Sequence, residues 1–591
     1  MAVTSSFGST LYLGLGSTYH DPALALVDDH GRVLFAEALE RPLQQKRALN
    51  QEADHPSVLP ALLETYGHHF DRLVVASNWN ARRPWYEHLA HRLGWLEPRG
   101  ILRHQGRELA ACLPTWQLHY MQSLQRHALA KQGVSLARLL RERFPGVAVA
   151  FRSYDHHLTH AALGAYASPF RDAACAVIDS YGEQGALAFF AFEDGKLRPL
   201  YRSRGPQSLG FFYMKLTELC GFDWLAGEEW KVMGLAAYGQ QNDALLRLFE
   251  QLFKVDGFDL HQDRSRFFKV RRQLEAYRRP LGAPAEDAAD LAKTGQVFFT
   301  QSVNALLSGF RVQGLSENLV LAGGCALNSS TNGQLLRGTG FERLYIPSAP
   351  ADDGTALGAA LLAYHSEHPR APGRERPLSP YLGSTPKTEE IERFARFSGL
   401  QAERLSDEAL FVRAAQLLAE GGLLGWMRGR AEFGPRALGH RSILADPRDP
   451  EMMARINARV KFRERFRPYA PAILDEYGDA YFHDYQFSPY MAQTLRYRSE
   501  VLDRVPAVVH ADGTGRVQSV SRHLHPDLHG LLSVFHDLTR VPLLLNTSFN
   551  VMGKPMVHSV EDAFAVFMGS GLDALIVGDR LFVKPRKAFT G

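Results

Sequence analysis

A repeated pattern of three short apolar runs constrains the fold of this chain more than any other feature of its sequence. The runs of the two copies are Leu11–Gly16, Ala23–Val27 and Val33–Glu37, and then Ala173–Asp179, Ala186–Phe192 and Lys196–Arg202. Turn-forming residues separate the runs in both copies, which is typical of strands joined by hairpins. The repeat therefore predicts a duplicated domain in which each half begins with three consecutive strands.

The first turn of each copy is polar, with His20-Asp21 in one half and Asp179 at the start of the turn in the other. Duplicated domains of this layout are actin-like or sugar-kinase-like ATP-binding folds, in which the two first turns face each other across the nucleotide phosphates. We therefore predict an α/β fold that begins with a duplicated actin-like domain.

Composition shifts twice along the chain. Residues from about 80 to 145 are rich in Trp, His, Leu and Arg, and we interpret them as a helical insertion between the two halves. Repeated prolines make the segment His365–Lys387 the best linker candidate, and arginines crowd beyond it. We expect an N-terminal domain at residues 1–375 and a second α/β domain at residues 376–591.

Overall composition excludes several classes of protein. The 591 residues carry a formal net charge of +4, which does not favour a nucleic-acid partner. The four cysteines are far apart and form no CxxC pair, which argues against a disulfide framework and a thiolate zinc site. The N-terminus does not resemble a signal peptide, and no apolar stretch approaches the roughly 20 residues of a membrane-spanning helix. We expect a cytoplasmic protein without a membrane partner.

The segment DHHLTHAA at residues 155–162 is the sharpest local signal. On a helix, His156 and His160 would lie on one face, where two imidazoles can bind one divalent ion. Asp179 and Asp352 add two carboxylates, and this set suits Fe, Mn or Zn without distinguishing among them. Asp353 is an alternative to Asp352, and a helix with packed histidines is the alternative to a metal site.

Glycine turns mark candidate nucleotide contacts in the N-terminal half. Gly323-Gly324, before a predicted helix, would leave room for a nucleotide or offer N–H groups to an anion. Lys231, within EEWKVMG, is a further candidate, with a surface lysine as the alternative.

The C-terminal half carries a dense set of cations in GRAEFGPRALGHRS (429–442) and in the residues that follow it. They are Arg430, Arg436, Arg441, Lys461, Arg463, Arg465 and Arg467. Guanidinium groups and lysine suit phosphate recognition. A solvated basic face is the alternative, but interleaved aromatic residues such as Phe433 and Phe466 favour a pocket. Further along, Asn546, Ser548 and Asn550 follow an apolar run and either bind a phosphate or carbamoyl amide or cap the strand.

Eight motifs that run in order over nearly the whole chain resemble the carbamoyltransferase family that includes the tobramycin and cephamycin O-carbamoyltransferases and the nodulation carbamoyltransferases. They are His20-Asp21, DHHLTHA (155–161), EEWKVMGLAAYG (228–239), GGCALN (323–328), DDGTALGAA (352–360), GRAEFGPRALGHRS (429–442), VKFRERFRPYAPAIL (460–474) and LLLNTSFNVMGKPMV (543–557). No single motif is specific, but the ordered set is.

The resemblance implies an N-terminal domain similar to the actin-like domain of tRNA threonylcarbamoyl transfer and a C-terminal α/β domain similar to threonylcarbamoyl-AMP synthase. It implies that the C-terminal site makes carbamoyl-AMP from carbamoyl phosphate and ATP, with Mg²⁺ accompanying ATP. The N-terminal site would then transfer the carbamoyl group to a hydroxyl of a small natural product, such as an antibiotic.

The resemblance also implies roles for individual residues. The C-terminal site would use Arg436, Lys461 and Ser548 in catalysis, with Arg430, Arg441, Arg465, Arg467, Asn546 and Asn550 as neighbours. The N-terminal site would bind a metal, usually iron in this family, through His156, His160, Asp179 and Asp352. Its nucleotide contacts would be Lys46, Gly182, Glu229, Lys231, Gly323, Gly324 and Asn328.

His20 matches the histidine near the transfer centre, and an imidazole suits a general base at neutral pH. The alternative is a His–Asp turn that only hydrogen-bonds the backbone. One departure from the family is Ser180, which stands where the family usually has glycine after Asp179, so the backbone there would approach a nucleotide differently.

Two other functions compete with this hypothesis. Transfer of threonylcarbamoyl to tRNA uses both domain types, but it needs an RNA-binding surface, which the small net charge does not favour. A non-catalytic ATP-binding regulator would leave the C-terminal arginines and the two-histidine, two-aspartate set unexplained. The sequence does not identify the acceptor, and it does not distinguish a monomer from a homodimer.

Overall fold

The computed structural model describes residues 9–66, 70–80, 125, 127–205, 207–464 and 466–584, which group into two units. Unit 1 comprises Met1–Glu40, Arg47–Leu327 and Gln334–Leu378, and unit 2 comprises Arg41–Lys46, Asn328–Gly333 and Ser379–Gly591. The units differ from the expected domains, 1–375 and 376–591, chiefly in the two short segments 41–46 and 328–333. Most of the expected helical insertion lies outside the described residues.

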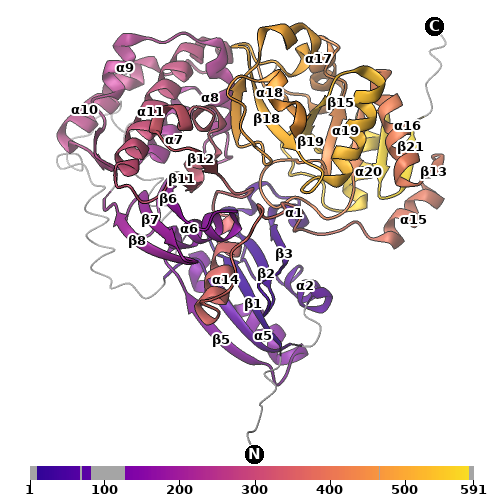
Figure 1. Cartoon of the computed structure of the whole chain (residues 1–591), viewed down its shortest axis with the longest axis horizontal. Helices are drawn as coiled ribbons and strands as arrows, with labels where there is room; N and C mark the ends of the chain where they lie inside the picture. Colours follow the sequence, from indigo (N-terminus) through magenta and orange to yellow (C-terminus); the bar gives the residue numbers. More distant parts are fainter. Residues whose placement is uncertain are drawn as a thin grey trace, which may run out of the picture. The chain divides into compact units, whose positions relative to one another are not determined.

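Unit 1 contains two five-stranded sheets with the same topology (Figure 1). The first, in the order β3-β2-β1-β4-β5, consists of β1 (Ser9–Gly16), β2 (Ala23–Val27), β3 (Val33–Ala38), β4 (Phe70–Ser77) and β5 (Ala148–Ser153). The second, in the order β12-β11-β6-β7-β8, consists of β6 (Ala173–Ile178), β7 (Leu187–Glu193), β8 (Lys196–Arg202), β11 (Asn318–Ala322) and β12 (Arg343–Tyr345). In each sheet three antiparallel strands are followed by two parallel ones. The predicted duplication of a three-stranded unit is confirmed.

Helices α6 (His156–Ala167) and α14 (Gly354–Glu367) pack against each other, and α14 also contacts β1 and β2. A Cβ atom at Gly358 would overlap the carbonyl oxygen of Thr159, and one at Gly14 would overlap that of Ala356. Glycine at these two positions therefore allows the backbones to approach closely. This approach brings the loop before α14 to the first turn of α6.

The remaining elements of unit 1 are mostly helices. They are α2 (Leu59–Tyr66), α5 (Val134–Arg143), α7 (Leu209–Leu219), α8 (Glu229–Leu235), α9 (Asp243–Phe249), α10 (Arg264–Leu274), α11 (Ala289–Arg311) and α13 (Leu335–Thr339), with a hairpin of β9 (Lys254–Asp256) and β10 (Asp259–His261). None of the helices that the structure describes, in either unit, is long and apolar enough to cross a membrane.

Unit 2 is built on a nine-stranded mixed sheet in the order β13-β21-β20-β14-β15-β19-β16-β18-β17. The strands are β13 (Ala402–Arg404), β14 (Leu424–Met427), β15 (Arg441–Ala445), β16 (Ala470–Leu474), β17 (Gln493–Arg496), β18 (Thr514–Val520), β19 (Leu543–Ser548), β20 (Ala574–Val577) and β21 (Arg580–Val583). The helices are α1 (Glu40–Leu43), α12 (Ser329–Asn332), α15 (Thr388–Phe397), α16 (Asp407–Ala419), α17 (Met452–Ile456), α18 (Gly478–Tyr481), α19 (Pro526–Thr539) and α20 (Val560–Gly569). Both units thus have a mixed α/β fold.

Replacing Gly358 by Ala should destabilise unit 1, because the added methyl group would overlap the Thr159 carbonyl and push α14 away from α6. Overpacking of this kind typically costs about 1–3 kcal/mol. Thermal unfolding compares this variant with Gly373→Ala, where an added Cβ meets nothing within 4 Å. Equal unfolding temperatures for the two variants would contradict the close packing of α6 and α14.

Candidate functional site

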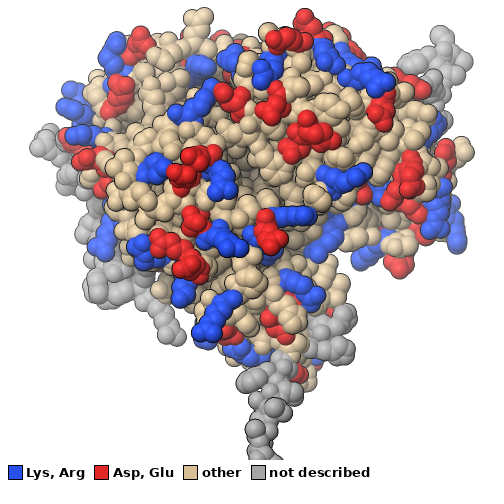
Figure 2. Space-filling model, in the orientation of Figure 1, with Lys and Arg blue, Asp and Glu red and all other residues tan. Residues whose placement is uncertain are grey.

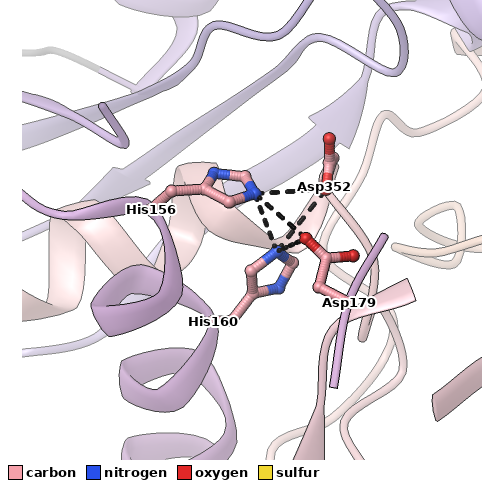
Figure 3. A group of neighbouring side chains, drawn as sticks. All are labelled: His156, His160, Asp179 and Asp352. Carbon is pink, nitrogen blue, oxygen red and sulfur yellow. Dashed lines mark hydrogen bonds and ion pairs between the residues drawn. The ribbon is translucent and has the colours of Figure 1, made fainter. Parts of the chain in front are cut away.

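Four side chains of unit 1 converge on one point, as Figure 3 shows: His156, His160, Asp179 and Asp352. The Nε2 atoms of the two histidines are 3.3 Å apart, and each lies 3.5 Å from Oδ1 of Asp352. Oδ2 of Asp179 lies 3.4 Å from Nε2 of His156 and 3.9 Å from Nε2 of His160. Two nitrogens and two oxygens therefore surround a common centre.

Regular secondary structure positions these four residues. Asp155 caps α6 by accepting a hydrogen bond from the N–H of Leu158, so His156 begins the helix and His160 follows one turn later. Asp179 directly follows β6, and Asp352 lies in the loop before α14. The predicted grouping of all four side chains is therefore present in the structure.

Backbone groups orient the members of this cluster. Nδ1 of His160 lies 3.1 Å from the carbonyl oxygen of Pro350, so it donates to that oxygen and leaves Nε2 with a free lone pair. The N–H of Gly324 donates to Oδ1 of Asp179 at 3.0 Å, which leaves Oδ2 directed at the histidines. Such supporting contacts are typical of histidine and carboxylate ligands.

The donor set fits a divalent metal ion. Ligand atoms about 2.1 Å from one ion lie roughly 3–3.5 Å from one another, which is close to the separations of this cluster. Burial would lower the pKa of His156, but the carboxylates of Asp352 and Asp179 outweigh burial and raise that pKa to about 10. The same carboxylates would attract a metal cation in place of the proton.

The structure distinguishes Asp352 from Asp353 as a candidate metal ligand. Asp353 lies outside the four-residue cluster and accepts a hydrogen bond from the N–H of Gly354, which caps α14. Burial, together with the nearby Asp21 and Glu40, raises the pKa of Asp353 to about 8. Asp352 is therefore the carboxylate that suits a metal.

A second polar group surrounds His20 and adjoins the cluster. Nδ1 of His20 lies 2.8 Å from Oδ2 of Asp21 and 3.8 Å from Oδ2 of Asp352. Arg47 donates to the same Asp21 oxygen, and Glu229 lies close enough for its charge to affect the pKa of Arg47. His20 therefore lies beside Asp352 of the four-residue cluster, and its predicted role in transfer stays a prediction.

The glycines predicted as nucleotide contacts lie beside side chains of the site. The N–H of Gly323 donates to the Pro350 carbonyl at 2.9 Å, and that of Gly324 donates to Asp179, so both amides already have acceptors. Gly182 packs against the ring of His157, where a Cβ atom would overlap the imidazole. The amides of Gly323 and Gly324 therefore help to hold the site together, and the predicted contact of these glycines with a nucleotide stays a prediction.

Three other predicted nucleotide contacts have different surroundings. Lys46 and Asn328 belong to unit 2, where the Asn328 side chain caps α12 by accepting from the N–H of Thr331. Lys231 remains in unit 1, where its ammonium group forms a 2.6 Å ion pair with Glu228 and lies 5.4 Å from the centre of the Phe222 ring. The Lys231 side chain is only 12% exposed, so it differs from the surface lysine of the alternative interpretation, and its predicted nucleotide contact stays a prediction.

A cation cluster lies in unit 2 around Lys461. Its members are Lys46, Arg436, Lys461, Arg463, Arg467 and Arg516. Burial, and then the charges of Arg463, Arg467 and Lys46, hold the pKa of Lys461 well below its usual range. Burial, with Arg436 and Arg463 nearby, has the same effect on the pKa of Arg516.

Backbone geometry presents Lys461 to this cluster. Helix α17 continues into a π-helical turn, Asn457–Lys461, which ends at Phe462 with a left-handed φ of 48°. Such turns recur at functional sites. The buried ammonium group donates to Oδ1 of Asn550 at 2.7 Å, to the Asn550 carbonyl at 3.0 Å and to the Ser548 carbonyl. Lys461, Ser548 and Asn550 are therefore together, as the sequence predicts.

Several polar residues that are predicted as ligand contacts also support the loop around Arg436. Arg441 is fully buried and donates to the carbonyls of Arg428, Gly429, His440 and Ser384. Arg430 donates to the carbonyls of Leu382 and Gly383, and Asn546 donates to the Ala437 carbonyl and to Gln518. Buried carbonyls require such donors, so these side chains have structural contacts.

Two residues of this region, Arg516 and Glu432, have no role predicted from the sequence. Arg516 lies on β18, far in sequence from the arginine-rich segment, and β18 pairs with β16, the strand that follows that segment. Oε1 of Glu432 accepts from the backbone N–H groups of Leu438, His440 and Arg441. The sequence signal that could have indicated Glu432 is that it is the single acidic residue among the arginines of residues 429–442. Arg465 lies outside the described residues.

The cluster of His156, His160, Asp179 and Asp352 predicts the metal content of the purified protein. Purified protein should hold about one divalent ion per chain, and His160→Ala should weaken metal binding by more than the roughly 10–100-fold that loss of a supporting contact costs. Elemental analysis after dialysis measures the ion content. The matched control is His30→Ala, since His30 is 73% exposed in the same unit. Equal metal content in the two variants would contradict the assignment.

Comparisons with known proteins agree with this arrangement. The sequence matches "Carbamoyltransferase N-terminus" over residues 12–361 and "Carbamoyltransferase C-terminus" over residues 415–584. "Uncharacterized protein sll1178" of Synechocystis sp. is 33% identical over 615 residues, covering 97% of each chain. "Nodulation protein NolNO" of Sinorhizobium fredii is 36% identical over 446 residues, which cover 73% of this chain and 63% of that protein. The chain therefore belongs to the carbamoyltransferase family and is an enzyme that transfers a carbamoyl group.

Proposed function

We propose that this enzyme is an ATP-dependent O-carbamoyltransferase with its two reactions in separate units. Unit 2 makes carbamoyl-AMP from carbamoyl phosphate and ATP, and unit 1 transfers the carbamoyl group to a hydroxyl of a small natural product, as in antibiotic tailoring. The protein acts in the cytoplasm. The observation that carries the proposal is the cation cluster around Lys461. Carbamoyl transfer in unit 1 would not by itself require buried cations in unit 2, whereas a reaction between phosphorylated substrates would.

The cation cluster suits a reaction between two phosphorylated substrates. ATP and carbamoyl phosphate are both anionic and repel each other, so bringing them together requires fixed positive charge. Lys461 and Arg516 are cations whose charged forms burial disfavours, and bound phosphates would offset that cost. Within the described residues, Nη2 of Arg463 and Nε of Arg516 are buried without a hydrogen-bond partner, so both can donate to phosphate oxygens.

The formation of carbamoyl-AMP from carbamoyl phosphate and ATP also consumes one water molecule. Carbamoyl phosphate and water give carbamate and phosphate, and a carbamate oxygen then attacks the α-phosphorus of ATP and expels pyrophosphate. Arg436 and Lys461 stabilise the negative charge that accumulates on the phosphate oxygens. Ser548 and Asn550, which contact Lys461, hold its ammonium group in place.

The transfer reaction uses the His20 group. Unprotonated His20 would accept the proton of the acceptor hydroxyl while that oxygen attacks the carbamoyl carbon, and AMP leaves with the electrons of the broken C–O bond. His156, His160, Asp179 and Asp352 would hold Fe²⁺, with Mn²⁺ or Zn²⁺ as alternatives. When bound, the ion supplies positive charge for the AMP phosphate.

The topology of the two units supports this division of labour. The repeated sheets of unit 1 agree with an actin-like domain, whose two halves bind a nucleotide between them. The nine-stranded mixed sheet of unit 2 is compatible with a threonylcarbamoyl-AMP-synthase-like domain.

A small-molecule acceptor agrees better with the surface than tRNA does. Figure 2 shows Lys and Arg interspersed with Asp and Glu on the face drawn, so neither sign forms a continuous field there. Proteins that bind RNA backbones usually gather basic residues into a patch or stripe. We therefore expect no nucleic-acid or membrane partner, and a chain that works as a monomer or homodimer.

Pyrophosphate release tests the proposal. Wild type given ATP, Mg²⁺ and carbamoyl phosphate should release pyrophosphate, and Lys461→Ala should lower the rate by at least about 100-fold, since it removes fixed charge from the reacting phosphates. His20→Asn should still form the adenylate, because His20 belongs to unit 1. A coupled pyrophosphate assay follows the rate.

The matched control is Lys387→Ala, which removes a lysine of unit 2 that is 75% exposed. Equal loss in this control would assign the Lys461 effect to the fold. A wild type that releases no pyrophosphate with any divalent metal would contradict adenylate formation. Stimulation of AMP release by tRNA, but not by small alcohols, would favour threonylcarbamoyl-type transfer.

A further inference from the structure

We propose that Arg47 is a positioning residue for carbamoyl transfer, acting through Asp21 to fix the orientation and tautomer of His20. This inference rests on the proposed function, since it assigns His20 as the group that accepts the hydroxyl proton. Arg47, Asp21 and His20 all belong to unit 1.

One carboxylate oxygen joins the three residues. Oδ2 of Asp21 lies 2.8 Å from Nδ1 of His20, and it accepts from Nε of Arg47 at 3.2 Å and from Nη2 at 3.0 Å. The remaining guanidinium nitrogen, Nη1, donates to the carbonyls of Trp224 and Leu225 at 3.4 and 3.2 Å. Every guanidinium nitrogen of Arg47 is therefore occupied, and its position is set from two sides.

The backbone fixes the same arrangement. Asp21 and Arg47 both have a left-handed backbone, with φ of 54° and 60°, which is uncommon for arginine. The N–H of Asp21 donates to the Arg47 carbonyl at 2.7 Å, and the N–H of Arg47 donates to Oε2 of Glu40 at 3.0 Å. Unfavourable backbone conformations that are held by such contacts cluster at functional sites.

The ring of His20 is restrained as a result. Tyr19 packs edge-on against it with ring centres 4.3 Å apart, and Asp21 accepts the Nδ1 proton. Nε2 then carries the lone pair and can accept the acceptor's hydroxyl proton. In that step the O–H bond breaks, a C–O bond to the carbamoyl carbon forms, and AMP departs with the electrons of its own C–O bond.

A comparison of two nucleophiles distinguishes the positioning of His20 by Arg47 from other possible roles of Arg47. Glycerol is an alcohol and needs a base to lose its proton during attack. Hydroxylamine attacks through a neutral amine nitrogen whose lone pair is free without a base. Full-length protein with ATP, Mg²⁺ and carbamoyl phosphate is given either nucleophile, and glyceryl carbamate or hydroxyurea is quantified by mass spectrometry against a blank without enzyme.

Arg47→Gln should lower glyceryl carbamate formation by about 10–100-fold, which is less than the roughly 100–10,000-fold that a positioned base contributes, because His20 itself remains. It should leave hydroxyurea formation nearly unchanged, and Arg47→Lys should restore part of the glycerol activity. His20→Asn should show the same dependence on the nucleophile. The control is Arg32→Gln, which breaks an Arg–Asp ion pair elsewhere in unit 1 and should affect neither product.

Equal loss of both products in Arg47→Gln would overturn the inference, because Arg47 would then act on the adenylate or on the fold. Unchanged glycerol activity in Arg47→Gln would also overturn it. Pyrophosphate release is measured in every sample. If wild type releases none, the proposed function fails, whereas normal release with unaltered transfer in Arg47→Gln refutes the role of Arg47 alone.

Discussion

Charge buried without an equal opposite charge is the physical constraint on which the site in unit 2 depends. Lys461 is buried, and its neighbours Arg463, Arg467 and Lys46 are also cationic. Both the desolvation of these charges and their mutual repulsion therefore raise the free energy of the folded unit. The surrounding backbone must therefore be rigid. The supporting residues provide this rigidity, since Glu432 accepts hydrogen bonds from three backbone N–H groups of the loop and Arg441 donates to four backbone carbonyls. Anionic substrates would recover the cost.

Unit 1 differs from unit 2 in that the charged groups brought together at its site are mostly carboxylates. Asp179 and Asp352 face His156 and His160, whose neutral imidazoles can share a metal ion with them. The close packing of α14 on α6 brings these residues together, although they lie far apart in the chain. Asp21 is offset separately by Arg47, which lowers the pKa of Asp21 to about 2 against the effect of burial and keeps it available as a hydrogen-bond acceptor. Each unit therefore has an electrostatic character that suits one of the two reactions that we propose.

Local patterns predicted much of this arrangement. The strands of both halves follow from apolar runs between turns, and the i, i+4 spacing of His156 and His160 follows from helical periodicity. Contacts between distant segments could not be predicted. The grouping of Lys46 and Asn328 with unit 2 depends on where short segments pack, and Arg516 lies near the other cations on a strand that is distant from them in sequence. The choice of Asp352 over Asp353 depends on which carboxylate caps α14, and the amides of Gly323 and Gly324 are occupied by acceptors that the sequence does not show.

Separation of adenylate formation from transfer is the central claim, and direct detection of carbamoyl-AMP tests it. The full-length His20→Asn protein would be mixed with ATP, Mg²⁺, carbamoyl phosphate and glycerol, quenched in acid and analysed by mass spectrometry. The account predicts that carbamoyl-AMP accumulates in this variant and is absent in Lys461→Ala. Formation of glyceryl carbamate without any carbamoyl-AMP in His20→Asn, or undiminished adenylate in Lys461→Ala, would contradict it.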